Sequence, residues 1–133
     1  MGKTVLLLHE LPDGGRHYDW LLERPGGGGA GVGAGTGEGP LVSFRVSDRI
    51  DAGAVEFVAT RQADHRREYL TYEGPVSGGR GVVRRVAEGA LEIEEDGPQR
   101  FRVRGRLGGA TGVFEGHRGT GAAWSFTFVS GEE

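Results

Sequence analysis

Val5-Leu6-Leu7-Leu8-His9 is a short apolar run, and with the residues up to Glu23 it decides the fold. A turn sequence follows it, Leu11-Pro12-Asp13-Gly14-Gly15, in which proline presets φ, aspartate accepts hydrogen bonds and glycine tolerates positive φ. Arg16 to Glu23 then predicts a second strand, antiparallel to the first. The amino terminus is therefore expected to form a β-hairpin whose first strand is buried.

Strand signals continue along the chain at short intervals. Apolar or alternating runs between Gly- and Asp-rich turns predict strands at 41–46, 55–60, 100–107, 110–115 and 123–129, with a hairpin of 81–86 and 90–94 across 87–89. The one plausible helical pattern covers 62–70, where Asp64 can cap the first turn. Short strands with frequent turns predict an all-β sandwich or small barrel with one short helix.

The length of 133 residues predicts a single domain that spans 1–133. Glycine is unusually frequent, at 27 residues, and nine of these lie in the fourteen positions 26–39. Such a composition is typical of a flexible loop, from which no packed core can be built. A phosphate-binding loop is disfavoured there, because no Gly-Lys-Ser/Thr follows and no helix pattern begins after the glycines.

Composition excludes several classes of site and location. The chain has no cysteine, so disulfides and thiolate zinc sites are excluded, and a metal must be held by histidine and carboxylate. The run Val5–Leu8 is too short to span a membrane, and no apolar segment of signal-peptide length begins the chain. We therefore expect a cytoplasmic protein without membrane contact.

The formal net charge of −3 argues against strong general binding of nucleic acid, because phosphate contacts need cations. Arginines nevertheless alternate with other residues along one predicted strand, at Arg100, Arg102, Arg104 and Arg106. Alternation with a period of two sends these side chains to one face of the strand. That face is either an ordinary solvated surface or one that follows a phosphate backbone.

His17 and Asp19 form the most informative pair of polar residues. They lie two positions apart on a predicted strand, so both side chains point to the same face. An imidazole and a carboxylate on one face can bind a divalent metal, and His9 can supply a third ligand from the neighbouring strand. The alternative is a pair of half-exposed polar residues on a solvated strand face.

Three motifs follow one another in the chain. They are His17-Tyr18-Asp19-Trp20-Leu21-Leu22-Glu23, then Asp64-His65 with Tyr69 four residues later, then Tyr72-Glu73-Gly74-Pro75-Val76-Ser77-Gly78-Gly79. The ordered set resembles the 3′-phosphoesterase domain of bacterial DNA ligase D, and the similarity extends from Leu6 to about Phe114. The resemblance implies a compact β-barrel with its active site on one concave flank.

The same resemblance implies roles for individual residues. His9, His17 and Asp19 match the metal ligands of the family, which hold manganese or a similar divalent cation. His65 and Tyr69 match a second cluster, in which the histidine protonates the leaving oxygen or binds the phosphate and the tyrosine donates a hydrogen bond to it. Without the resemblance, His65 is expected to be an exposed loop residue.

The chain departs from the family where cations are expected. Leu21 occupies the position of an arginine that contacts phosphate in the family. Either Arg45 or Arg61 binds the phosphate from a different backbone position, or the protein is a weak or inactive relative. The choice matters, because one such electrostatic contact contributes about 10²–10³-fold in rate.

Three functions remain open on the sequence alone. The first is a DNA 3′-end-processing phosphoesterase of DNA repair, which uses Mn to remove a 3′-phosphate or terminal ribonucleotide and works with a repair ligase or polymerase. The second is a catalytically weak or inactive adaptor for nucleic acid or protein. The third is a phosphoesterase that acts on a small phosphorylated metabolite. We expect a monomer in each case.

Overall fold

The structure is a computed structural model that describes residues 2–25 and 39–131. Within these residues strands dominate, with only short 3₁₀ turns besides, so the predicted all-β class is confirmed. The Gly-rich loop predicted at 26–39 lies outside the described residues, apart from Gly39. In the described part of the chain, no helix is long and apolar enough to cross a membrane. The elements are β1 (Gly2–Glu10), β2 (Arg16–Glu23), β3 (Leu41–Val46), η2 (Ile50–Ala52), β4 (Glu56–His65), η3 (Arg67–Leu70), β5 (Gly74–Pro75), β6 (Val82–Asp96), β7 (Arg100–Leu107), β8 (Ala110–Arg118) and β9 (Ala123–Ser130).

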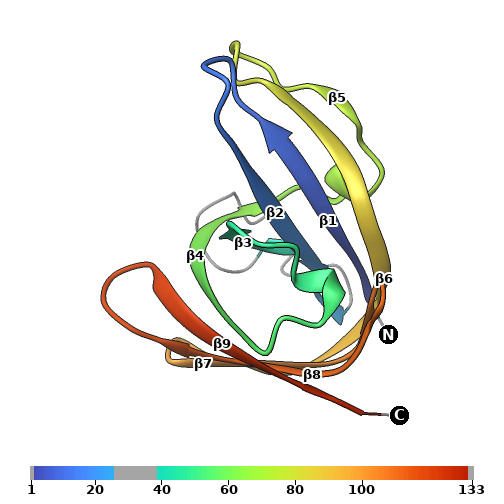
Figure 1. Ribbon diagram of the computed structural model, residues 1–133, viewed down its shortest axis with the longest axis vertical. Coiled ribbons are helices and arrows are strands. Elements are labelled where there is room, and N and C mark those ends of the chain that lie inside the picture. The colour runs from blue at the N-terminus through green and yellow to red at the C-terminus, as the bar shows by residue number, and fades with distance from the viewer. Residues whose placement is uncertain (1, 26–38, 132–133) are drawn as a thin grey trace.

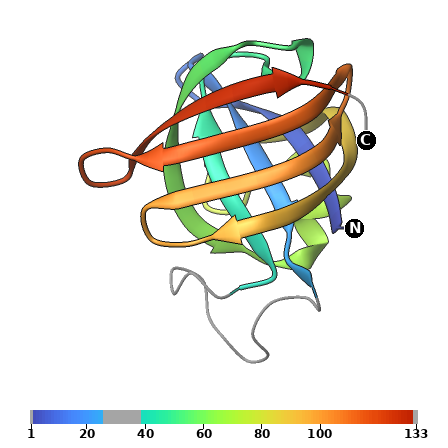
Figure 2. The ribbon, with the colours of Figure 1, turned by 90° about the horizontal axis from the view of Figure 1, so that it is seen from below.

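The sheet closes on itself to form a barrel (Figure 1). Its strands follow the order β1-β2-β3-β4-β9-β8-β7-β6-β5, and β1 also pairs with β6, so that the ring is complete without β5. Figure 2 shows β6 to β9 crossing in front of β1, β2 and β3. Closure leaves both edges of β1 paired, and each pairing is antiparallel.

Aromatic side chains fill much of the barrel interior. Trp20 is fully buried, and its ring centroid lies 5.1 Å from that of Phe114 and 5.5 Å from that of Phe126. Phe44 packs at the same centre, with its ring centroid 5.1 Å from that of Phe126. These tilted and edge-to-face contacts are the arrangements that aromatic rings prefer.

A second, smaller apolar cluster lies on the outer face of the barrel wall, and we call it the outer cluster. Residues 66–81, which we call the covering segment, contain η3 and β5 and pack on this cluster through Tyr69, Leu70 and Val76. The wall near β1 is thus apolar on both faces, as the continuous apolar run of β1 predicts. The buried members of the outer cluster are Val5, Leu7, Leu21, Leu41, Leu70 and Val83.

One strand replaces the hairpin predicted across 87–89. β6 runs without a turn, because β1 pairs along its first part and β7 along its second. Gly89 is needed for close packing: a Cβ built there would lie 1.8 Å from the carbonyl oxygen of Arg106. The hairpin prediction is wrong because this glycine marks a close approach of two backbones and not a turn.

The helix predicted over 62–70 is wrong in its first half. Residues up to His65 continue β4, and only Arg67–Leu70 form a 3₁₀ turn. Asp64 does not cap this turn, because its carboxylate accepts a 2.8 Å hydrogen bond from the Gly39 amide and pairs with Arg24. Both partners are distant in sequence, so the local pattern contains no sign of them.

Thr4→Val tests a polar contact at the centre of the core. Thr4 Oγ1 accepts a 3.0 Å hydrogen bond from Trp20 Nε1 and donates one of 2.8 Å to the Leu21 carbonyl. Valine leaves the buried indole N–H without an acceptor, so we expect the free energy of unfolding to fall by about 1–3 kcal/mol. Urea unfolding measures the loss. Thr60→Val, on an exposed position of β4, should stay within about 0.5 kcal/mol, and an equally small loss in Thr4→Val would contradict this account.

Candidate metal centre

The first two strands bring together the three predicted metal ligands. β1 and β2 pair in a register that places His9 directly opposite His17 and Leu7 opposite Asp19. Because side chains alternate along each strand, all three polar groups lie on the outer face of the barrel wall, beside the outer cluster. The centroids of the two imidazole rings are 4.8 Å apart.

The ligand atoms converge on one carboxylate. His9 Nδ1 lies 3.3 Å from Asp19 Oδ2, and His17 Nε2 lies 3.1 Å from Asp19 Oδ1. One atom from each of the three side chains can be chosen so that all lie within 4.8 Å of one another. His17 and Asp19 are buried and His9 is half-buried, so the group is shielded on most sides.

Hydrogen bonds around the histidines leave nitrogen lone pairs for a cation. His9 Nε2 lies 2.7 Å from the carbonyl oxygen of Arg80, which can only accept, so this nitrogen carries a proton and Nδ1 is the acceptor of the neutral ring. His17 Nε2 is buried and forms no hydrogen bond with any described residue. A cation bound between these nitrogens and Asp19 would satisfy both, so the residues present fit a metal.

The donor set suits a divalent transition metal. Two imidazole nitrogens and one carboxylate are ligands for iron, cobalt, nickel, zinc and manganese, and three protein ligands leave positions for water or substrate oxygens. The Arg80 carbonyl fixes the orientation of the His9 ring, as hydrogen bonds to metal-bound histidines do. Nothing in this geometry selects manganese among these metals.

A cavity of about 630 Å³ opens beside the ligands, between the outer face of the wall and the covering segment. His9 and Asp19 line it together with Arg45, His65 and Tyr69, which are predicted to bind phosphate or act in catalysis. Residues from β1, β2, β3, β4 and η3 therefore meet at one place. The resemblance implies such a grouping on one flank, and of the strand pairings the sequence predicts that of the first two strands.

Arg45 and His65 both have donors or acceptors available for a substrate. Arg45 is exposed and lies opposite Asp19 on the neighbouring strand, and its side chain forms no hydrogen bond or ion pair with any residue that the structure describes. His65 Nδ1 lies 2.9 Å from the Ala63 carbonyl oxygen and donates to it, which leaves Nε2 for the cavity. The Tyr69 ring packs edge-on against that of His65, with centroids 5.3 Å apart.

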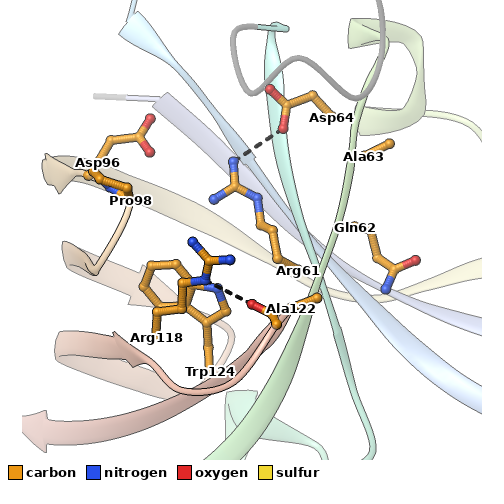
Figure 3. Close-up of a pocket in the computed structure, with 11 residues that line it drawn as sticks. Arg61, Gln62, Ala63, Asp64, Asp96, Pro98, Arg118, Ala122 and Trp124 are labelled. Atoms are coloured by element: carbon orange, nitrogen blue, oxygen red, sulfur yellow. Dashed lines mark hydrogen bonds and ion pairs between the residues drawn. The ribbon is translucent and has the colours of Figure 1, made fainter.

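Arg61, the other predicted phosphate ligand, lies apart from the metal ligands. Its guanidinium carbon is 5.3 Å from the centroid of the Phe44 ring, and its Nη2 is 3.3 Å from Asp64 Oδ1. It lines a different cavity, which Figure 3 shows. Leu21 is fully buried in the outer cluster, so the residue that replaces the family's arginine serves packing.

Glutamates neutralise much of the arginine row of β7. Arg102 and Arg104 both donate to Glu94, at 2.8 and 2.9 Å, and Arg100 donates to Glu115 at 2.5 Å. Hydrogen bonds from Arg104 and Arg102 hold the pKa of Glu94 below its ordinary value. These pairs favour the interpretation of this face as an ordinary solvated surface.

Two parts of the site have no clear signal in the sequence. Arg80 contributes a main-chain carbonyl to His9, and every residue has a carbonyl, so no side-chain pattern could have identified it. The covering segment contains glycines with positive φ, at Gly78, Gly79 and Gly81, which let the chain turn back toward β1. These glycines are the only hint of the fold-back.

A scan against models of protein families and a search of curated proteins both find no match to this chain. The similarity to the 3′-phosphoesterase domain of bacterial DNA ligase D therefore stays a prediction from the sequence motifs.

His17→Gln tests the metal centre against a matched control. A ligand that binds only the folded state raises Tm, and at 100 times its Kd it adds about 2.7 kcal/mol of stability. We expect Mn²⁺, Co²⁺ or Zn²⁺ to raise the Tm of the natural protein and His17→Gln to lose this shift. His117→Gln, at an exposed histidine outside the site, should keep it. Equal shifts in both variants, or no shift in the natural protein, would contradict the site.

Proposed function

We propose that this protein is a metal-dependent phosphoesterase that removes a 3′-phosphate or terminal ribonucleotide from DNA ends. The observation that supports this most is that one cavity is lined by two of the three metal ligands, by a histidine–tyrosine pair and by Arg45, whose side chain has no partner among the described residues. The choice of DNA as substrate, of manganese as metal and of a repair ligase or polymerase as partner follows the resemblance to the ligase D domain.

His9, His17 and Asp19 would hold the cation through His9 Nδ1, His17 Nε2 and the carboxylate, which lie close to one another. When bound, a divalent metal supplies charge neutralisation to a phosphate group and stabilises negative charge that develops on its oxygens. The Arg80 carbonyl would keep the His9 ring in the orientation that presents Nδ1.

Arg45 would orient the phosphate. A guanidinium group presents parallel N–H donors that match two phosphate oxygens. Arg45 faces Asp19 across neighbouring strands, so its charge lies on the same side of the wall as the metal ligands. Because it has no ion-pair partner among the described residues, phosphate binding there breaks no existing contact.

His65 and Tyr69 would assist the leaving group. In hydrolysis of a 3′-phosphate, a water oxygen bonds to phosphorus and loses a proton, the bond from phosphorus to the 3′ oxygen breaks, and that oxygen gains a proton. Protonated His65 can donate this proton from Nε2, since Nδ1 is held by the Ala63 carbonyl. The Tyr69 hydroxyl can donate a hydrogen bond to a phosphate oxygen.

A small phosphorylated metabolite is the second candidate substrate. The net charge of −3 and the glutamate-paired arginines of β7 offer little general attraction to DNA. A cavity of about 630 Å³ can also enclose a small molecule. Comparing kcat/KM for a 3′-phosphorylated primer–template with that for a panel of sugar phosphates separates the two. Absence of turnover on both would instead favour the adaptor.

His65→Ala tests the catalytic assignment. General acid catalysis contributes about 10²–10⁴-fold in rate, so manganese-dependent release of phosphate from a 3′-phosphorylated primer–template should fall by that factor. The metal-induced rise in Tm should remain, because His65 is not among the three ligands. His117→Ala should keep full activity. Turnover that survives His65→Ala would assign this histidine to the surface.

Arg45→Gln and Arg61→Gln distinguish the two predicted phosphate ligands. Arg45 lines the cavity with the metal ligands and Arg61 does not, so Arg45→Gln should lower kcat for 3′-phosphate release by about 10²–10³-fold. Any effect of Arg61→Gln should appear mainly in KM. Steady-state kinetics well below Tm measure both, and a larger loss of kcat in Arg61→Gln would reverse the assignment.

A further inference from the structure

A second cavity, of about 440 Å³, opens at one end of the barrel (Figure 3). Three parts of the chain line it: the end of β4, the turn between β6 and β7, and the hairpin between β8 and β9. Trp124 forms part of its wall but is only 3% exposed, so little of the indole can be reached from the cavity.

Two guanidinium groups enter this cavity from opposite sides. Figure 3 shows Arg61 on β4 and Arg118 on the β8–β9 hairpin directed into the same space. Arg61 uses Nη2 to pair with Asp64, and Arg118 uses Nε to donate a 2.8 Å hydrogen bond to the Gly121 carbonyl. The Nη groups of Arg118 form no hydrogen bond with any residue in 2–25 or 39–131.

The acidic groups at this cavity are already paired. The side chain of Asp64 is 1% exposed and contacts Arg24 as well as Arg61. Asp96 Oδ2 accepts a 2.8 Å hydrogen bond from Arg24 Nε. The charged groups here are three arginines and two aspartates, namely Arg24, Arg61, Arg118, Asp64 and Asp96. One positive charge is therefore not balanced by a negative charge within this group. Its location on Arg118 makes the cavity attractive to an anion.

One strand separates this cavity from the one beside the metal ligands. Gln62 and Ala63 line both cavities, and Figure 3 shows Arg61 and Gln62 pointing to opposite sides of β4. β4 pairs with β9 as far as Thr60, and the Arg61 amide still donates a 2.8 Å hydrogen bond to the Ala122 carbonyl, so the pairing with the β8–β9 hairpin ends at Arg61. Neighbouring strands are about 4.8 Å apart, so the wall that the single strand β4 forms between the two cavities is thin.

We infer that the second cavity is a phosphate subsite for the DNA strand whose 3′ end lies at the metal centre. A single strand carries one phosphate per nucleotide, so a strand that passes over the end of β4 would place successive phosphates on its two sides. Arg118 and Arg61 would bind a phosphodiester upstream of the end. This inference rests on the proposed function and adds a preference for a polynucleotide over a small phosphate ester.

The subsite recognises the backbone and not the bases. Arginine contacts to phosphate carry no sequence information, and the one indole at the cavity is too buried to stack on a base. Binding should therefore depend on the length and charge of the strand and be independent of its sequence.

The test measures binding without turnover. A 3′-phosphorylated single-stranded decamer, labelled at its 5′ end, is titrated with protein in EDTA and followed by fluorescence anisotropy at several salt concentrations. Arg118→Gln should weaken binding about tenfold, as loss of one charged hydrogen bond does. It should also reduce the slope of log Kd against log salt by about 0.7, which corresponds to one phosphate contact on a single strand. Arg118→Lys, which keeps the charge, should lose less affinity for the decamer than Arg118→Gln.

Arg106→Gln is the matched control. Arg106 is an exposed arginine that also donates to main-chain carbonyls, at Glu88 and Gly108, and it lies outside both cavities. Equal losses in the two glutamine variants, or no measurable binding by the natural protein, would overturn the subsite. Because the assay needs neither metal nor turnover, Arg118-dependent binding without phosphate release would contradict the proposed activity and leave the subsite supported.

Discussion

β1 is hydrogen-bonded along both edges, and the barrel and the candidate metal centre both depend on this pairing. Side chains alternate along the strand, so Leu6 enters the core while Leu7 and His9 lie on the outer face. A shift of one residue in register would exchange these faces. It would remove Leu6 from the core and separate His9 from His17. The strand that closes the barrel therefore also positions the metal ligands.

A polar group on the outer face of the barrel wall interacts strongly with a charge only where it is partly shielded from water. The covering segment supplies this shielding, because Leu70 and Val76 pack on the outer cluster while the Arg80 carbonyl accepts from His9. Charges interact more strongly where water is partly excluded. The apolar contacts that fix this segment thus favour cation binding by Asp19 and its neighbouring histidines, and the same contacts form one wall of the cavity.

The features that follow from side-chain alternation could be predicted from the sequence. They include the first hairpin, the shared face of His17 and Asp19, and the outward direction of Arg45 between two core residues. What could not be predicted depends on register between strands. Arg61 lies opposite Phe44 and faces the barrel interior because β4 continues to His65, and an irregularity between Leu41 and Ser43 then shifts the register so that Leu41 lies opposite His65. A glycine such as Gly89, which allows two backbones to approach closely, cannot be distinguished in the sequence from a glycine that marks a turn.

The overall charge of −3 is a poor guide to what this barrel can bind, because electrostatic interactions at a surface act locally. The Debye length is about 8 Å at physiological ionic strength, so acidic groups on a distant face have little effect at either cavity. The glutamates beside β7 satisfy the arginines of that strand, whereas Arg45 and the Nη groups of Arg118 have no such partner among the described residues. Each of the two cavities that flank the end of β4 thus has an arginine donor available for an anion. A phosphate chain attracted there would be held by a few contacts, so the slope of log affinity against log salt should be shallow, about 0.7 for each phosphate contacted.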